Sequence, residues 1–157
     1  MKKIDPNHPA MVEIATPLGQ MVRWTNHHFF SLMNQRAGVQ MDRSSMAILN
    51  QVGVHGPLRI SAIAQHLDLD PSTLSRQVAA AEQSGYVVRV ADKSDARVNL
   101  VSATAKGLEL HNRLIAAWRV IVAELFAEMP EDERKVLARA LDRFVDKFIM
   151  LEQELRS

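Results

Sequence analysis

The middle of this sequence constrains its fold most, because two short helical segments lie there on either side of a tight turn. Ser61 is the predicted N-cap of the first helix. Asp70 and Pro71 follow the turn as the N-cap and first residue of a second helix, which runs to Gln83. Gly85 can then supply the left-handed residue that ends this helix.

Two extended segments follow the pair of helices. Residues 86–90 are rich in strand-favouring side chains, 91–96 form a polar turn, and 98–101 favour a second strand. Residues 58–60, ahead of the first helix, are also predicted to be short and extended. A helix, a turn, a second helix and a β-hairpin make the pattern of a winged helix-turn-helix. The predicted fold class is therefore mainly α, with a small β-hairpin wing.

The second helix of this pair has two faces of opposite character. Leu74, Val78 and Ala81 share an apolar face that can dock on the rest of the domain. The other face carries Ser72, Thr73, Arg76 and Gln77. Arginine can read guanine, glutamine can read adenine, and hydroxyls reach phosphates or bases. This pattern favours a helix that reads DNA. The alternative is a polar helix face that only contacts water.

Long helices are predicted on both sides of this lobe. Residues 11–36 show helical apolar spacing that ends at Gly38, and Asp42 can cap the next helix. Thr104 can cap the first of two long C-terminal helices, which are separated at Pro130. Their apolar seams are Leu108, Ile115, Trp118, Val122, Leu125 and Met129, and then Leu137, Leu141, Phe144, Phe148, Leu151 and Leu155. The apolar surface of these seams exceeds what the two helices need to pack against each other within one chain. Part of it, together with segment 4–11, is therefore predicted to lie between subunits.

Composition narrows the class of protein. The 157 residues are 47% hydrophobic and 24% charged, which suits one compact domain with an oligomerisation element. The absence of cysteine excludes disulfides and suits a reducing cytoplasm, where we expect the protein to reside. No secretory signal or membrane span is visible. Residues 1–106 are mildly basic and 107–157 mildly acidic, which suits a DNA-facing front but arises equally well by chance.

Together these residues resemble the MarR family of regulators. The resemblance covers nearly the whole chain, and its wing part is the more specific. It rests on Ser61–Leu67, Pro71–Val78 and Glu82–Val87, and on a wing signature of Arg89, Asp92–Arg97, Leu100–Thr104 and Gly107.

The resemblance implies a homodimer that binds a palindromic operator on double-stranded DNA, usually as a repressor released by a small ligand. It implies a winged helix-turn-helix lobe over 42–104, with the helix-turn-helix at 60–84 and the wing at 86–101. Residues 1–37 and 105–157 would supply the dimerisation helices. The residues implied to face the major groove are Ser72, Thr73, Ser75, Arg76 and Gln77.

The wing departs from the family pattern at its tip. Ala96 stands where the family often has arginine, although Lys93 nearby can act as a point charge on phosphate. Arg97 corresponds to the wing arginine of the family. Two interpretations of Arg97 stay open: contact with DNA, or an ion pair with Asp95 that supports the wing.

A ligand pocket is implied between the dimerisation helices and the DNA lobe. Its predicted lining is Trp24, His27 and Met46, with a small aromatic acid or phenol as effector and Trp24 emission as its reporter. The alternative is ordinary core or dimer interface, because aromatic stripes at helical spacing are usually core.

No catalytic set, cofactor motif or metal-ligand spacing is visible, so the chain is not predicted to be an enzyme or to need a cofactor. His27 and His28 are adjacent and point in different directions on a helix, and His111 is interpreted as a core or interface histidine. Two rival functions remain: a dimeric small-molecule or metal-binding helical protein without DNA binding, and an RNA-binding winged domain.

Overall fold

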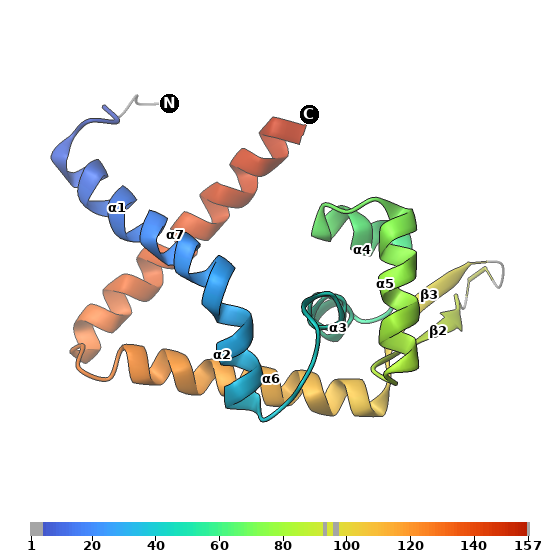
Figure 1. Cartoon of the computed structure of the whole chain (residues 1–157). Helices are drawn as coiled ribbons and strands as arrows, with labels where there is room; N and C mark the ends of the chain where they lie inside the picture. The colour runs from blue at the N-terminus through green and yellow to red at the C-terminus, as the bar shows by residue number, and fades with distance from the viewer. Residues whose placement is uncertain (1–4, 93, 96–97, 157) are drawn as a thin grey trace. The chain divides into compact units, whose positions relative to one another are not determined.

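The computed structural model of the chain describes residues 5–92, 94–95 and 98–156. It is mainly helical, with a small antiparallel sheet of three strands (Figure 1), which confirms the predicted fold class. The chain divides into two compact units, Met1–Trp118 and Arg119–Ser157. The division falls inside a long helix, and the functional division predicted at residues 104 and 105 stays a prediction.

The first unit begins with three consecutive helical segments where the sequence predicted one helix. They are α1 (Pro9–Trp24), the π-helical turn η1 (Thr25–Phe29) and α2 (Phe30–Ala37). Gly38 ends α2 in the left-handed conformation, as predicted, with φ at 61°. A π-helical turn widens the helix locally, and such turns occur often at functional sites. Periodicity over 11–36 does not reveal it, because the chain stays helical throughout.

Among the helices of the helix-turn-helix lobe, two predicted N-caps are correct and one is wrong. Asp42 caps α3 (Arg43–His55) by accepting the Ser45 N–H at 2.8 Å, and Asp70 caps α5 (Pro71–Gln83). Ser61 is not a cap, because α4 (Ile60–Leu67) begins one residue before it. The strand β1 (Leu58–Arg59) leads directly into α4, so its pairing with the sheet sets the start of the helix.

The sheet has the order β1-β3-β2 and is antiparallel throughout. The hairpin strands are β2 (Val87–Ala91) and β3 (Asn99–Ala103), one to two residues further along the chain than predicted. Val101 pairs with Arg89 on one side and with Leu58 on the other. The segment predicted only as extended is therefore a third strand, and it ties the wing to the start of α4.

A single core lies beneath the helix-turn-helix. It joins α3, α4, α5, the sheet and the first turns of α6 (Ala105–Leu125), and its fully buried members include Ile48, Ile63, Leu74, Val78 and Val101. Figure 1 shows α5 beside the hairpin, and α5 contacts both α3 and β2. The apolar face predicted for α5 is thus the face that docks on the domain.

The start of α6 is fixed to the turn after α5. The Thr104 hydroxyl donates to the Gly85 carbonyl at 2.7 Å and accepts from the Gly107 N–H at 3.0 Å, as a predicted cap should. A Cβ at Gly107 would lie 2.0 Å from the Tyr86 carbonyl oxygen, so this position has no room for a side chain. Further along α6, Arg113 donates to the carbonyls of Ala37 and Gly38 at 2.6 and 3.0 Å and caps the end of α2.

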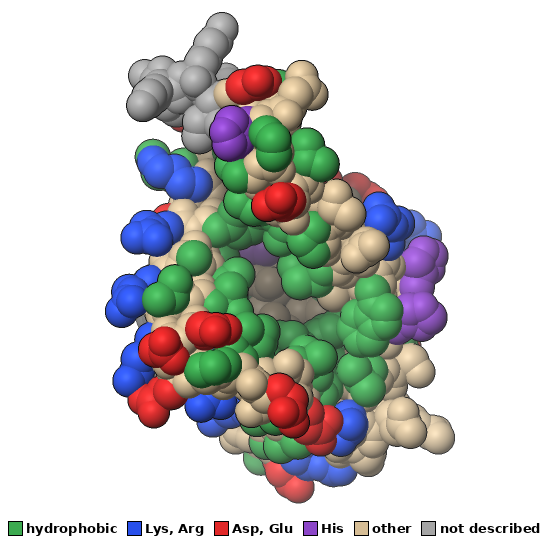
Figure 2. All heavy atoms as spheres, turned by 90° about the vertical axis from the view of Figure 1, so that its left-hand side faces the viewer, with side chains coloured by type: hydrophobic (Ala, Val, Ile, Leu, Met, Phe, Trp, Pro, Cys, Tyr) green, Lys and Arg blue, Asp and Glu red, His purple; other side chains and the backbone are tan. Residues whose placement is uncertain are grey.

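The second unit contains the end of α6 and α7 (Glu131–Arg156), which begins just after Pro130 with three acidic residues in its first turn. Most apolar side chains of α7 are exposed in the single chain, including Leu141, Phe144, Phe148 and Leu151; the Leu155 side chain lies outside the described part. Figure 2 shows hydrophobic side chains at the surface among charged ones. Within the described chain, no helix combines the length and hydropathy needed to cross a bilayer.

Candidate nucleic-acid interface and ligand cavity

The first turn of α5 is held by one aspartate. A carboxylate oxygen of Asp70 accepts the N–H groups of Ser72 and Thr73 at 3.0 and 2.9 Å, and the Ser72 hydroxyl at 2.6 Å. The bond from the Ser72 hydroxyl, with the bonds from Thr73, holds the pKa of Asp70 far below its usual value. The first turn of α5 is therefore capped by its own side chains, although it is exposed.

The predicted DNA-reading residues lie on the free side of α5. Ser72 and Arg76 are exposed, whereas Thr73, Ser75 and Gln77 are half-buried beside the docked face. Leu74 and Val78 are completely buried. The helix therefore presents one long basic side chain among short polar ones, and the half-buried positions have a more restricted reach.

An ion pair connects α5 to the wing. The Arg89 guanidinium on β2 lies 2.8 Å from the Glu82 carboxylate, which also accepts the Arg89 backbone N–H at 3.0 Å. Both side chains are partly exposed, so the pair contributes only modest stability. Its double contact does set the direction in which β2 leaves the end of α5.

The wing turn is organised by Asp92. Its carboxylate accepts the N–H and hydroxyl of Ser94 at 2.8 and 2.7 Å, and its own N–H donates to the Val98 carbonyl at 2.8 Å. Asp95 is exposed and accepts the Val98 N–H through its backbone. Lys93, Ala96 and Arg97 lie outside the described residues, so the predicted roles of Lys93 and Arg97, and the Asp95 pair, stay predictions.

One basic residue beside the wing was missed by the sequence analysis. Arg59 on β1 is exposed, and its charge helps to lower the pKa of Asp92, after the larger effect of the hydrogen bonds from Ser94. The sequence showed only a short extended segment at this position. Its proximity to the wing depends on the pairing of β1 with β3, which hydrophobic pattern does not predict.

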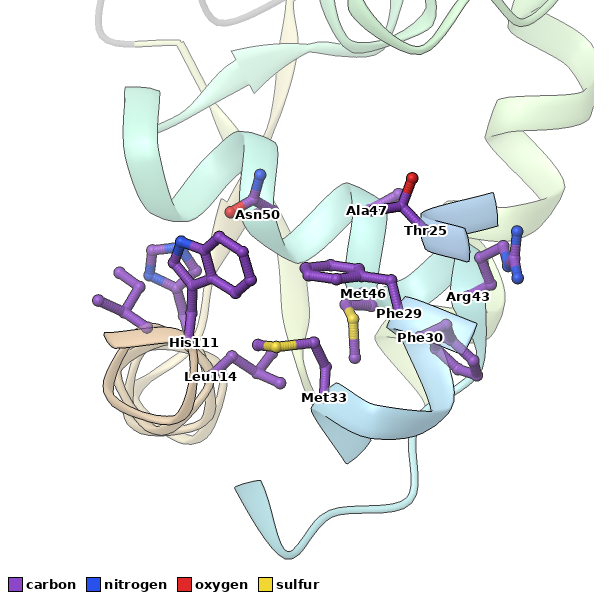
Figure 3. A pocket seen from close by; sticks show the side chains of 12 residues that line it. Thr25, Phe29, Phe30, Met33, Arg43, Met46, Ala47, Asn50, His111 and Leu114 are labelled. Atoms are coloured by element: carbon purple, nitrogen blue, oxygen red, sulfur yellow. The ribbon is translucent and has the colours of Figure 1, made fainter. Parts of the chain in front are cut away.

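A cavity of about 380 Å³ lies in the first unit, away from α5. Its walls come from η1, α2, α3 and α6 (Figure 3). The apolar lining consists of Phe29, Phe30, Met33, Met46, Ala47, Leu114, Ile115 and Trp118. The polar lining consists of Thr25, Arg43, Asn50 and His111. This volume and composition are typical of sites for small organic ligands.

Of the three predicted pocket residues, Met46 lines this cavity, while Trp24 and His27 are not among its described lining. Trp24 is 47% exposed, and its ring lies against His28. Trp118 lines the cavity instead and meets the Phe29 ring edge to face at 5.4 Å. Trp24 precedes the π-helical turn and is exposed, whereas Phe29 at the end of the turn lines the cavity.

His111 is the unusual member of the cavity wall. Its side chain is buried, and its Nε2 atom has no hydrogen-bond partner among the described residues. Burial lowers the pKa of the imidazole, so the ring is neutral at physiological pH. The interpretation as a core histidine is correct for burial, but it did not anticipate an unpaired ring nitrogen beside a cavity.

No three His, Cys, Asp or Glu side chains come together as a metal-binding group in the part of the chain that the structure describes. His27 and His28 are exposed, with their ring centres 6.3 Å apart.

Comparison with known proteins places these features in one family. A family model for the MarR family matches residues 41–98, which span α3 to the wing. The uncharacterised helix-turn-helix regulator YxaD of Bacillus subtilis is 35% identical over 100 residues, covering 57% of this chain and 70% of that protein. The repressor MdtR of the same organism is 26% identical over 90 residues, covering 57% of this chain and 58% of MdtR.

Solved structures share most of the fold at low sequence identity. A MarR family protein from Bacillus stearothermophilus has a TM-score of 0.75 at 17% identity, covering 87% of this chain and 96% of that one. The regulator PcaV of Streptomyces coelicolor, solved with its natural ligand, has a TM-score of 0.54 at 24% identity, covering 93% and 98%. The likeness therefore extends over the long helices as well as the winged lobe.

Proposed function

The chain belongs to the MarR family of transcriptional regulators, which are not enzymes, and we propose that it is a homodimeric repressor that binds a palindromic operator and releases it when a small ligand fills the cavity. The observation that carries this proposal is the contrast between the two faces of α5. A capped helix presents exposed Arg76 and Ser72 beside half-buried polar side chains, over a completely buried apolar face.

In this proposal α5 enters the major groove. Arg76 reads a base edge, because it is exposed near the start of α5, whereas Ser72, Thr73, Ser75 and Gln77 contact phosphates or bases close to the helix. The wing lies beside the groove, where Lys93 and Arg97 act on phosphates or hold the turn with Asp95. Arg59, whose charge acts on Asp92, adds a further cation beside the described part of the wing. Residues 42–104 form this DNA-binding lobe.

Dimerisation is supported by apolar side chains that the single chain leaves exposed. On α6 they are Leu108, Trp118 and Leu125, and on α1 they include Val12 and Ile14. An obligate dimer interface typically buries more than about 2,000 Å² and is rich in such side chains. We therefore assign 1–37 and 105–157 to dimerisation, with the exposed apolar face of α7 as its largest part.

The position of the cavity can couple ligand binding to DNA binding. It is walled by α3 on one side and by η1, α2 and α6 on the other, and α3 packs directly against α5. A ligand that favours one spacing between α3 and α6 also favours one position of α5. The ligand complex of PcaV and the repressor activity named for MdtR support the same assignment for this chain.

Selection from a library of randomised duplexes tests the DNA part of the proposal. We expect enrichment of an inverted repeat whose half-sites lie about one helical turn apart, because two copies of α5 must reach the same side of the duplex. Structured RNA serves as the competitor and should not displace the selected duplex. A protein that enriches no duplex, yet binds small molecules, is instead the DNA-free helical binder considered above.

A further inference from the structure

We infer that His55 and His66 form a surface site for a divalent transition-metal ion, and that Zn²⁺ is the ion that fits its geometry. The site lies on the winged lobe, where α3 and α4 end. Neither histidine is among the described lining of the cavity, and neither belongs to the face of α5 proposed to read DNA. The site is therefore separate from the proposed function, and its test does not depend on DNA binding.

The turn after α3 brings the two histidines together. His55 is the last residue of α3, and Gly56 follows it with φ at 77°. The strand β1 then leads into α4, which packs against α3 and carries His66 in its last turn. Both histidines are exposed, and the centres of their rings lie 5.4 Å apart. Two imidazoles from different helices thus face the same small volume of solvent.

This spacing is that of two imidazoles bound to one tetrahedral metal ion. With Zn–N distances of about 2.1 Å and a tetrahedral angle at the metal, the centres of two rings lie about 5 Å apart. The planes of the two rings are tilted by 53°. This tilt is neither the parallel nor the perpendicular arrangement that aromatic pairs prefer, so stacking alone does not account for the pair.

Gln51 prepares His66 for metal binding. Its side-chain oxygen Oε1 lies 2.8 Å from Nδ1 of His66. Because an amide oxygen only accepts hydrogen bonds, Nδ1 carries the ring proton and Nε2 carries the lone pair. Metal-binding histidines commonly donate their second ring N–H to an oxygen in this way, which fixes the tautomer and the orientation of the ring. Gln51 and His55 lie one turn apart on the same face of α3, so both reach toward His66.

The backbone around the site also favours a cation. His55 and His66 lie in the last turns of their helices, where unpaired carbonyl groups concentrate partial negative charge. Imidazole nitrogen suits zinc and its neighbours among the transition metals, whereas Mg²⁺ prefers oxygen ligands. The described residues contain no group of three His, Cys, Asp or Glu side chains at this place, so water completes the coordination of the ion.

A bound ion connects two elements of the winged lobe. α4 contacts both α3 and α5, so an ion held by both histidines ties the end of α3 to the helix that supports α5. The two ligands come together only when the lobe is folded. Zinc should therefore stabilise the lobe by mass action.

Zinc titration of the full chain tests the site. Binding is measured by competition with a chromophoric chelator, and thermal unfolding is followed with and without Zn²⁺. We expect one ion per chain at the tightest site and a Tm that rises with Zn²⁺ but not with Mg²⁺. Co²⁺ in place of Zn²⁺ should show the intense visible bands of tetrahedral coordination. Absent zinc binding, or a Tm that zinc does not raise, would overturn the inference.

Single substitutions assign the ligands. His55→Ala and His66→Ala should each weaken zinc binding at least tenfold and abolish the rise in Tm; both residues are exposed, so the core is left intact. Gln51→Leu removes only the oxygen that orients His66 and should weaken binding about tenfold, whereas Gln51→Glu keeps an oxygen there and should bind zinc at least as tightly as the wild type.

His28→Ala is the matched control. It removes an exposed histidine whose ring centre lies 6.3 Å from that of His27, its neighbour on the same helical turn. Zinc affinity and the rise in Tm should stay as in the wild type. Unchanged affinity in either His55→Ala or His66→Ala, or an equal loss in His28→Ala, would show that zinc binds elsewhere and would refute the site.

Discussion

Polar groups on the exposed face of α5 and in the wall of the cavity differ in exposure and in hydrogen bonding. On α5 the cap is fully paired and the polar side chains face solvent, whereas the cavity encloses one ring nitrogen without a partner. Each exposed group competes with water and is worth little alone, so α5 suits a long charged partner that makes many contacts. The ring nitrogen in the cavity wall is shielded from water, so leaving it without a partner costs the folded state more than an exposed polar group would.

The largest expected effect tests the scaffold under α5. Leu74→Ala should lower the free energy of unfolding by about 3 kcal/mol, because a completely buried leucine leaves a cavity that the core only partly fills. Val54→Ala removes an apolar side chain that is 61% exposed on α3 and should change stability by less than about 0.5 kcal/mol. Denaturant unfolding measures both, and similar losses would mean that α5 is not docked as described.

Arg76→Ala should affect recognition without affecting the fold. A base-reading arginine is worth about 1–3 kcal/mol of discrimination, so operator binding should fall strongly while binding to scrambled duplex changes much less. Arg139→Ala removes an exposed arginine from α7 and should change neither. Fluorescence anisotropy on both duplexes is the measurement. Equal losses on the two duplexes for Arg76→Ala would show that base recognition lies on another residue.

Gly53→Ala should destabilise the protein by about 1 kcal/mol, a net effect of crowding against His111 and of improved helix propensity. Gly19→Ala is the matched control, because its new Cβ meets only the flexible end of Arg23 at 3.4 Å and should be neutral or stabilising. Thermal unfolding of both variants tests whether the imidazole of His111 occupies the space that a side chain at Gly53 would need.

The smallest effect concerns acid and the cap of α5. The lowered pKa of Asp70 means that its charge stabilises the folded state above the ordinary carboxylate range and that this contribution is lost as the pH falls through the lowered pKa. Asp70→Asn keeps a capping oxygen that does not titrate. The stability advantage of the wild type over this variant should therefore shrink on acidification. An advantage that stays constant or grows would contradict the assignment.

Sequence patterns predicted the helix-turn-helix well because its signals are local. Asp70 followed by Pro71, and Gly85 after the helix, act within one turn of chain, and the structure has each of them in place. Ser61 failed because the pairing of β1 with a strand about 40 residues later decides where α4 begins. Arg59 was missed for the same reason.

The cavity was harder to predict because its lining depends on helical phase and on packing between distant segments. Spacing assumes a constant 3.6 residues per turn, and the π-helical turn at Thr25–Phe29 breaks that assumption just after Trp24. The position of the His111 ring requires a glycine at Gly53, which lies 58 positions earlier in the chain. Nothing in the local pattern around either residue indicates that the two meet.

The central claim is that this chain binds duplex DNA specifically through α5, and a salt titration of the wild type and Arg76→Ala on selected and scrambled duplexes tests it most directly. Logarithmic affinity should fall linearly with the logarithm of salt concentration, by roughly one unit per phosphate contact. The wild type should prefer the selected duplex at every salt concentration, and Arg76→Ala should lose most of that preference. An affinity that does not depend on salt, or a wild type that binds both duplexes alike, would contradict the account.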